Sequence, residues 1–408
     1  MNISRELNQN KLNFISSIFI ILIPIFFLTG SLIINIAIIL FDLFFLYTLI
    51  KNRELNYLNN KYFFVLLIFW FYLIFNLFFI SINFDESLPR SLGFIRFIIF
   101  AFAISYFFEK KSNHIIKQIL GFWTLVFLFI SFDLIFEFVF GFNVFGYKSE
   151  FAGRLASVLN EELKIGHFYS AFILLALITI QNKIKDNNNN QNIFFFSIIF
   201  FLIISLLIGE RSNLIRTFIM ILFFIFLIER KNFFKKIFTI FIFLILMTTI
   251  SFNNPSFHDR IWAKLLKPLF KNPIELVSSS KYGSHYNVAI QVFENNKLFG
   301  VGLKNYRQEV TKKEYDRDAS IHPHQTHFEI LSELGLVGYI CFLLMFLYII
   351  FHSFKSFLKD KNKLKLCGLL FVIVSLLPIL PSGSFFTTFG AALFWFNFSF
   401  LLLKKKKF

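Results

Sequence analysis

The sequence predicts an all-α integral membrane protein with about 12 transmembrane helices, folded as a single polytopic domain over residues 1–408. Hydrophobic residues make up 57% of the chain, and its mean hydropathy is +0.68. Soluble domains contain roughly 45–50% apolar residues. The apolar residues gather in blocks of about twenty with almost no charge, which matches the thickness of the hydrocarbon core of a bilayer.

The apolar blocks alternate with short polar linkers along the chain. Every second linker is rich in Lys and Arg, beginning with Lys51 and Arg53 and ending with the tail 404–407. Because basic loops tend to stay in the cytoplasm, we expect both termini there, as an even number of spans also requires. The blocks are approximately 12–29, 31–50, 62–82, 91–108, 117–140, 166–181, 193–208, 213–228, 236–252, 329–354, 366–381 and 384–403.

The net charge of +17 also reflects these linkers. In a soluble protein such a charge would suggest a nucleic-acid partner. Here the positive charge lies mainly in the linkers, where it sets the orientation of the chain in the membrane, so we predict no nucleic-acid binding. Cys341 and Cys367 both lie within apolar blocks and lack metal-ligand spacing, so we expect two free thiols packed in helices.

Two linkers on the predicted outer face are long enough to suggest function. They cover about 141–165 and about 253–328. Long loops in an otherwise compact bundle usually carry binding or catalytic residues. Tyr286, Ala289, Ile290 and Phe293 recur at helical spacing, which predicts an amphipathic helix near 285–296 within the larger loop.

The larger loop is rich in basic and titratable side chains. Such residues outside the membrane suit an anionic ligand and proton transfer, although each one alone is also compatible with an ordinary solvated surface. They are His258, His285, His322, His324, His327, Arg260, Lys281, Lys304, Arg307 and Arg317.

The segment after Ile321 points to one of these histidines. Pro323 is a suitable first residue for a helix that leads into the 329–354 block. His324 would then lie in the first helical turn, where the positive end of the dipole attracts anions and keeps imidazole neutral.

A metal site is the alternative interpretation of the same segment. The spacing of His322, His324 and His327 permits metal binding, with Asp316 or Asp318 nearby. Asp316-Arg317-Asp318 also matches the D-x-D pattern of metal-dependent sugar-nucleotide transferases. That short pattern arises often by chance, and sugar nucleotides are cytoplasmic whereas this loop is predicted to lie outside.

Arginines on the predicted outer face are further candidates. Arg211 lies in the hairpin 209–213 between two blocks, and Arg154 lies in the first long loop. Positive residues are usually cytoplasmic, so an arginine on the outer face is a candidate for function, although it can also simply snorkel. Within the bundle, Arg96 can pair with Asp42 or Asp133, which would be a structural contact.

His324 and Gln325 are followed by nine residues, Gly335, two residues and Gly338. This pattern resembles the ligase signature of the O-antigen ligase and O-antigen polymerase superfamily of polytopic membrane glycosyltransferases. Residues 295–302 resemble the N-P-L-F-G-x-G turn of that family, with Lys297 in place of Pro. Residues 154–166 resemble its first outer loop, and residues 209–212 resemble its S-x-R-x hairpin.

The resemblance implies a bacterial inner (plasma) membrane enzyme that needs no cofactor and no metal. The donor would be a glycan on undecaprenyl pyrophosphate, and the acceptor a lipid A-core sugar or another glycan at the periplasmic face. His324 would be the general base and Arg211 a pyrophosphate ligand. For the second essential arginine of the family, Arg260 is our choice, although Lys281 and His285 lie closer to its usual place. The remaining expected substrate contacts are Arg154, Gln325 and Arg307.

Three functions remain open at this point. The signature favours a ligase that moves the glycan to lipid A-core, and no physical argument excludes a polymerase that extends the lipid-linked glycan. A membrane transporter is a third alternative. It would need paired interrupted helices and ionisable residues in mid-membrane, and Asp42, Asp133 and Glu137 are few.

Overall fold

The computed structural model describes residues 2–151, 153–159, 164–186, 191–228, 232–268, 272, 281–312, 315, 320–378 and 380–404, which contain helices and no strand. The apolar blocks form α1 (Asn2–Leu28), α2 (Ser31–Asn52), α3 (Lys61–Phe79), α4 (Phe84–Gly93), α5 (Ile95–Lys110), α6 (Asn113–Phe140), α7 (Ile165–Asp186), α8 (Asn192–Leu207), α9 (Arg211–Ile228), α10 (Phe233–Asn253), α16 (Thr326–Asp360), α17 (Lys363–Ser375) and α18 (Thr388–Phe398). The linkers and the C-terminal end hold η1 (Leu55–Leu58), η2 (Ser157–Leu159), α11 (Pro255–Phe257), the π-helix η3 (His258–Leu266), α14 (Lys281–Asn295), α15 (Tyr306–Glu309) and η4 (Ser399–Leu402).

The predicted blocks lie mainly on helices, but the structure does not establish twelve spans. Within the described ranges, eight helices are long and apolar enough to cross a membrane. α8 has 16 residues and α17 has 13. At 1.5 Å per residue these two extend only about 24 and 20 Å, against about 30 Å of hydrocarbon. The chain is therefore a multi-pass α-helical membrane protein whose shorter helices are packed among the longer ones.

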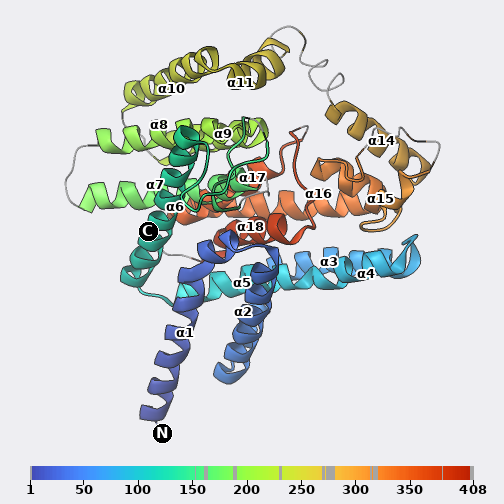
Figure 1. The fold of residues 1–408 in the computed structure, drawn as a ribbon. Helices are drawn as coiled ribbons and strands as arrows, with labels where there is room; N and C mark the ends of the chain where they lie inside the picture. The colour runs from blue at the N-terminus through green and yellow to red at the C-terminus, as the bar shows by residue number, and fades with distance from the viewer. Residues whose placement is uncertain are drawn as a thin grey trace.

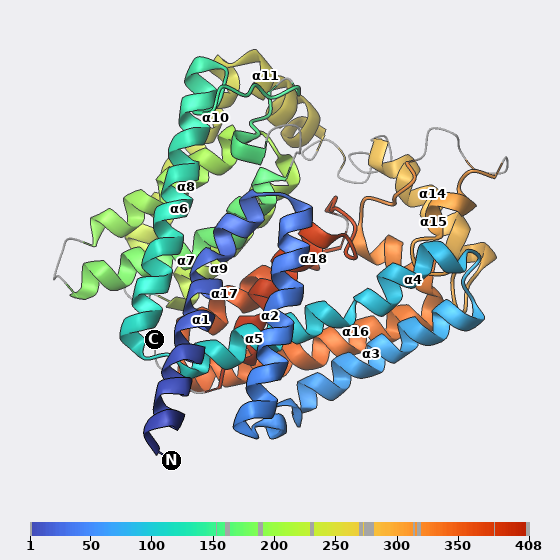
Figure 2. The ribbon, with the colours of Figure 1, turned by 60° about the horizontal axis from the view of Figure 1, so that its bottom comes forward.

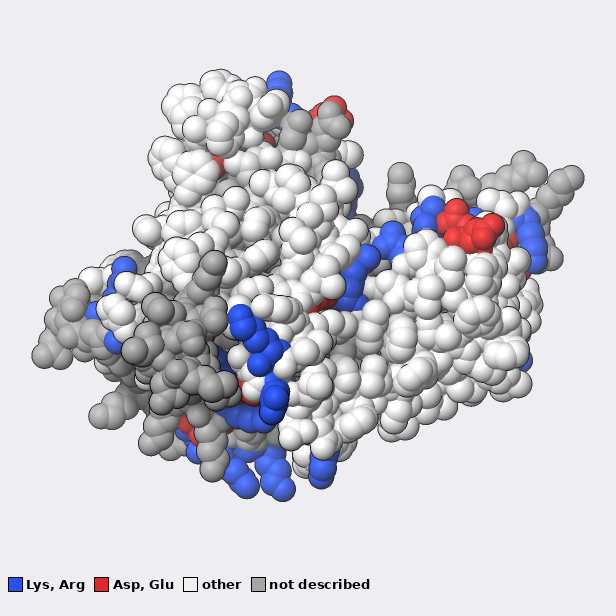
Figure 3. All heavy atoms as spheres, turned by 90° about the horizontal axis from the view of Figure 1, so that it is seen from below, with Lys and Arg blue, Asp and Glu red and all other residues white. Residues whose placement is uncertain are grey.

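The helices form one bundle with a cap at one end. Figures 1 and 2 show α3 and α16 side by side, with α14 and α15 beside one end of α16. α17 and α18 lie in the middle, where they contact α7, α9 and α5. The face in Figure 3 is uncharged over wide areas, and its Lys and Arg gather in a few groups. Such a surface is compatible with contact to lipid.

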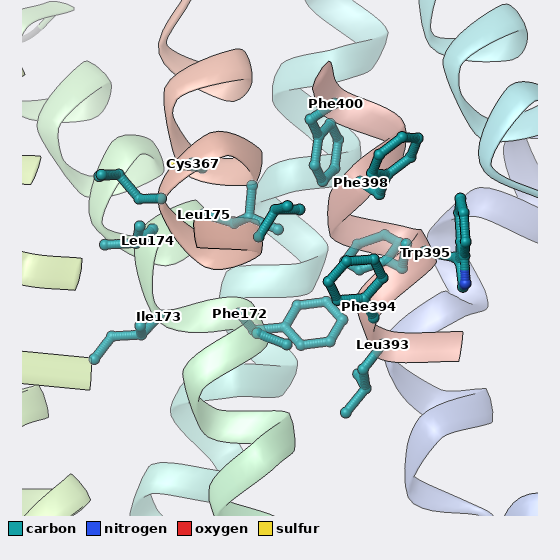
Figure 4. Close-up of a cluster of buried hydrophobic side chains, with 14 of the residues drawn as sticks. Phe172, Ile173, Leu174, Leu175, Cys367, Leu393, Phe394, Trp395, Phe398 and Phe400 are labelled. Atoms are coloured by element: carbon teal, nitrogen blue, oxygen red, sulfur yellow. The ribbon is translucent and has the colours of Figure 1, made fainter. Parts of the chain in front are cut away.

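The centre of the bundle is packed with aromatic and aliphatic side chains. Figure 4 shows Phe172 on the side of α7 that is turned toward α18, with Leu393, Phe394 and Trp395 of α18 nearby. The rings of Phe172 and Phe396 stack with centroids 5.2 Å apart. Cys367 is a buried free thiol and Cys341 a half-buried one, as expected from the sequence.

Two hydrogen bonds place the two ends of the chain on one side of the bundle. The backbone N–H of Lys404 donates to Glu109 at the end of α5 (2.6 Å), and the ammonium of Lys111 donates to the hydroxyl of Ser16 in α1 (2.6 Å). This agrees with an arrangement in which both termini share a compartment. Their assignment to the cytoplasm stays a prediction from the charge pattern.

α16 is not the single straight helix that the 329–354 block predicts. Gly335 has φ 66° and ψ −170°, and the chain folds back there. The ring of His327 lies 3.1 Å from the hydroxyl of Tyr339, whereas residues twelve apart on a straight helix would be about 18 Å apart. Residues 326–334 and 336–360 therefore form a helical hairpin with its apex at Gly335.

α14 confirms the predicted amphipathic helix, which begins four residues earlier than expected. Tyr286, Val288, Ala289 and Val292 are its buried residues, while Ile290 is 39% exposed. The apolar side thus includes Val288 and Val292 in place of Ile290. It packs against α16, and the Tyr286 and Phe328 rings lie 4.7 Å apart.

Candidate functional site

Three arginines from separate segments come together at one end of the bundle. Arg154 lies in the first long loop, Arg211 begins α9, and Arg260 lies in η3. Burial lowers the pKa of the Arg260 guanidinium below its usual value, and the positive charges of Arg154 and Arg211 lower it further. Mutual repulsion of this kind means that the three groups form one strongly positive region, which suits an anion.

Backbone contacts hold two of these arginines in place. The Arg260 guanidinium donates to the carbonyl oxygens of Gly153 (2.8 Å) and Gly209 (3.2 Å), so it joins the first long loop to the hairpin before α9. The Arg211 guanidinium donates to the carbonyl of Lys264 (2.8 Å) in η3. Each keeps further N–H groups for a ligand, because a guanidinium carries five donors.

Two acidic residues of α6 anchor the first long loop and so position Arg154. Asp133 accepts hydrogen bonds from the N–H of Val144 (2.7 Å) and from the hydroxyl of Ser157. Glu137 accepts the N–H of Ser157 (2.7 Å). Asp133 is thus committed to the loop and not to Arg96, whose electrostatic partner is Asp42.

Glu210 is a functional candidate that the sequence reasoning missed. It precedes Arg211, it is 6% exposed, and it accepts a hydrogen bond from the amide of Asn213. Burial raises the pKa of Glu210 to about 7, while Arg154 and Arg260 oppose the rise. The only available signal was an acid beside an arginine in an outer hairpin, which is a common surface pattern.

His324 lies in a second cluster, formed by titratable side chains of the large loop. Its ring centroid is 5.3 Å from that of His285, 4.9 Å from that of His322 and 6.0 Å from that of Tyr282. Its Nε2 lies 3.1 Å from the hydroxyl of Ser320. Burial lowers the pKa of His324 to about 4, and His322 and His285 lower it further.

The position of His324 differs from the expected first turn of a helix. α16 begins at Thr326, with Gln325 as its N-cap. Pro323 therefore does not begin the helix, and His324 lies before the cap with φ 55°. The lowered pKa has the predicted direction but a different main cause, namely burial together with neighbouring histidines instead of the helix dipole.

Tyr282 connects the two clusters. Its ring is near His324, and its hydroxyl is close enough to Arg211 for an electrostatic interaction. Tyr282 therefore lies between the arginine cluster and the His324 cluster, which are neighbours in the fold. The sequence reasoning missed Tyr282, because one aromatic residue at the start of an amphipathic helix carries no distinguishing signal.

The other expected substrate contacts divide into two groups. Gln325 is buried, and its side-chain oxygen caps α16 by accepting the N–H groups of His327 (2.6 Å) and Phe328 (3.1 Å). Arg307 on α15 interacts electrostatically with His322. The side chain of Lys281 lies outside the described residues, so its expected contact stays a prediction.

His327 does not join His322 and His324 in the arrangement that the metal alternative requires. His327 is directed away from the site, because its ring contacts the Tyr339 hydroxyl and lies 2.8 Å from the Leu376 carbonyl. In the described part of the chain, no group of three or more His, Cys, Asp or Glu side chains is arranged to hold a metal ion. Asp316, Arg317 and Asp318 lie outside that part.

The two glycines of the signature shape the helical hairpin next to the site. At Gly335 the reversal frees backbone groups of α16, and the N–H of Leu336 donates to the carbonyl of Lys297 (2.8 Å). In return, the N–H of Gly302 donates to the carbonyl of Glu333 (2.9 Å). The 295–302 turn is thereby joined to the hairpin apex, and this contact explains why the two motifs occur together.

Comparison with known families agrees with this arrangement. The O-antigen ligase family model matches residues 195–343. This match supports membership of the O-antigen ligase and polymerase superfamily. The matched region runs from α8 beyond the hairpin apex and includes Arg211, Arg260 and His324, while Arg154 lies outside it. No curated protein matches the chain significantly.

Proposed function

We propose that this superfamily member is a ligase-type glycosyltransferase of the bacterial inner membrane. It transfers a glycan from undecaprenyl pyrophosphate to a lipid A-core acceptor at the periplasmic face, without a metal or a nucleotide. The family match supports a ligase or polymerase in general. The observation that carries the proposal is the convergence of Arg154, Arg211 and Arg260 beside the His324 cluster.

The arginine cluster supplies the groups that a diphosphate leaving group needs. Guanidinium groups bind phosphate oxygens through paired, charge-assisted hydrogen bonds. As the bond between the anomeric carbon and the phosphate oxygen breaks, negative charge grows on the diphosphate and the arginines stabilise it. The Nε of Arg154 is buried and has no hydrogen-bond partner within the described ranges, and a buried donor of this kind is usually satisfied by a ligand or an ordered water.

His324 supplies the base. With a pKa of about 4 the free ring is neutral at pH 7 and has an unprotonated nitrogen. The acceptor hydroxyl attacks the anomeric carbon, its proton passes to His324, and undecaprenyl pyrophosphate leaves with the bonding electrons. A bound diphosphate nearby favours imidazolium, so donor binding raises the basicity of His324 during the reaction.

Reconstitution in lipid nanodiscs tests this proposal. The protein is mixed with an undecaprenyl-pyrophosphate-linked glycan and lipid A-core, and the products are separated by gel and mass spectrometry. Glycan attached to lipid A-core supports the ligase. Lengthening of the lipid-linked glycan alone identifies a polymerase, and no glycosidic product with either acceptor contradicts the proposal.

A further inference from the structure

A cavity with a mainly apolar lining lies inside the bundle behind the site. Its volume is about 90 Å³, and it is enclosed by α7, α9, α17, α18, the start of α16 and the 382–385 segment. A water molecule needs roughly 10–15 Å³ of such volume. The cavity therefore has room for several waters or for one small ring.

One end of the cavity adjoins His324. Thr326 and Ser382 line this end, and their hydroxyl groups lie 3.1 Å apart. The N–H of Ser382 donates to the carbonyl oxygen of His324 (2.7 Å). Gly383, next in the chain, is exposed at the opening. A group that enters there passes directly beside the backbone of His324.

Arg216 gives the cavity a buried hydrogen-bond donor. The residue is 6% exposed, and its guanidinium donates to the carbonyl oxygens of Pro381 (2.8 Å) and Leu380 (3.3 Å). Its Nε–H is buried and has no partner among the residues that the structure describes. A buried donor without a partner costs free energy, so such groups usually meet a ligand or an ordered water.

The rest of the lining combines polar groups with aromatic rings. Asn213 and His167 belong to the lining, with Asn213 Nδ2 3.2 Å from His167 Nδ1. Phe385 and Phe394 also belong to it, with ring centroids 5.0 Å apart. Binding sites that combine apolar walls with a few placed polar groups hold small polar rings well. A pyranose has this character, since hydroxyls surround its edge and C–H groups cover its faces.

We propose that this cavity is the subsite for the sugar ring of the acceptor, the ring that carries the reacting hydroxyl. The proposal rests on the proposed ligase function and deepens it. The donor diphosphate is assigned to Arg154, Arg211 and Arg260, so the cavity next to the His324 backbone is left for the acceptor. Arg216 donates to a ring hydroxyl, and the phenylalanines contact the apolar face of the ring.

Gly383 allows this cavity to be blocked with little change elsewhere. A Cβ built on Gly383 meets no atom within 4 Å, and its φ lies outside the left-handed region, so Gly383→Leu adds bulk at the opening without backbone strain. Gly121 in α6 also has open space around its Cβ, lines no part of this cavity and serves as the matched control as Gly121→Leu. Thermal unfolding of both variants checks that they are folded.

The test uses the full-length protein in nanodiscs, with lipid A-core and the undecaprenyl-linked glycan as probes. We expect Gly383→Leu to raise the KM for lipid A-core about tenfold or more while the KM for the donor stays near wild type, since the block affects only acceptor binding. Gly121→Leu should change neither value. Arg216→Lys keeps the charge but loses the Nε–H, and it should raise the acceptor KM as well.

Two results would overturn this inference. An unchanged acceptor KM in both Gly383→Leu and Arg216→Lys would show that the cavity holds only water. An equal rise in donor KM would assign the cavity to the donor glycan. If Gly383→Leu fails to fold, the acceptor KM of Arg216→Lys alone tests the proposal. Failure of the proposed function is distinguishable, because wild-type protein would then make no product with lipid A-core at all.

Discussion

Replacing Gly335 should disrupt the hairpin of α16 and the site beside it. Its dihedral angles lie in a region open almost only to glycine, where any other residue costs roughly 1–3 kcal/mol. A Cβ there would lie 2.5 Å from the backbone nitrogen of Gly300, which cannot move aside like a side chain. If the reversal opens, the bonds from Leu336 and Val337 to the 297–298 turn are lost, at about 1 kcal/mol each. We therefore expect Gly335→Ala to destabilise the protein by roughly 3–5 kcal/mol.

Thermal unfolding followed by tryptophan fluorescence measures this effect in detergent. We expect the apparent Tm of Gly335→Ala to fall by roughly 5–10 °C, together with loss of transferase activity. Gly121→Ala is the control, because its Cβ meets no neighbour within α6 and alanine favours a helix. A Gly335→Ala protein with the Tm and activity of wild type would refute the claim that the glycine is required by the fold-back.

Four other predictions concern the charges and the orientation. Arg211→Ala should lower activity about a hundredfold or more, and Arg211→Lys should recover only part of it because the guanidinium fork is lost; full activity of the Ala variant would remove Arg211 from the site. His324→Ala should stay folded and lose about a hundred- to ten-thousand-fold in rate, with no effect of chelators on wild type; restoration of chelator-treated enzyme by zinc would favour a metal. Burial holds the pKa of His322 and His324 at about 4, below the usual 6.5, so the unfolded chain binds more protons between these values and stability should fall from pH 6.5 towards 4. The Tm should follow this trend, and a slope unchanged in His324→Ala would contradict it. In a chain without its two natural cysteines, Cys at position 281 should react from the periplasm and Cys at Lys361 only after permeabilisation; the reverse pattern would invert the topology.

The sequence predicted the helical spans and the long loops, because these features depend on interactions between residues close together in the chain. A block of about twenty apolar residues has to be helical in a bilayer, since no water there can bond its backbone. The alternation of Lys-rich linkers, the two long loops and the helix near residue 285 follow from patterns a few residues long. The sequence also pointed to Arg211 and His324 of the candidate site, because arginines on the predicted outer face and a group of histidines are unusual in such a chain.

Contacts between segments distant in the sequence determined the shape of α16 and the surroundings of His324. The reversal at Gly335 depends on the 297–302 turn, which satisfies the backbone groups that a straight helix would have bonded internally. The hydropathy of the 329–354 block is that of a single transmembrane span, so the sequence predicts one straight helix there. The low pKa of His324 arises from burial beside His285 and His322 and not from a helix end.

Glu210 and Arg216 are the clearest examples of residues whose surroundings cannot be predicted from the local sequence. In the sequence they are an acid in a hairpin and a single charge in an apolar block. Their environment appears only when α7, α9 and α17 pack together and exclude water, because desolvation and the cavity are properties of several helices at once. The sequence by itself determined that this is a helical membrane protein with a long cationic loop that contains several histidines. Tertiary structure alone decided which of those charges share one site, because their spacing is set by packing between elements and not by distance along the chain.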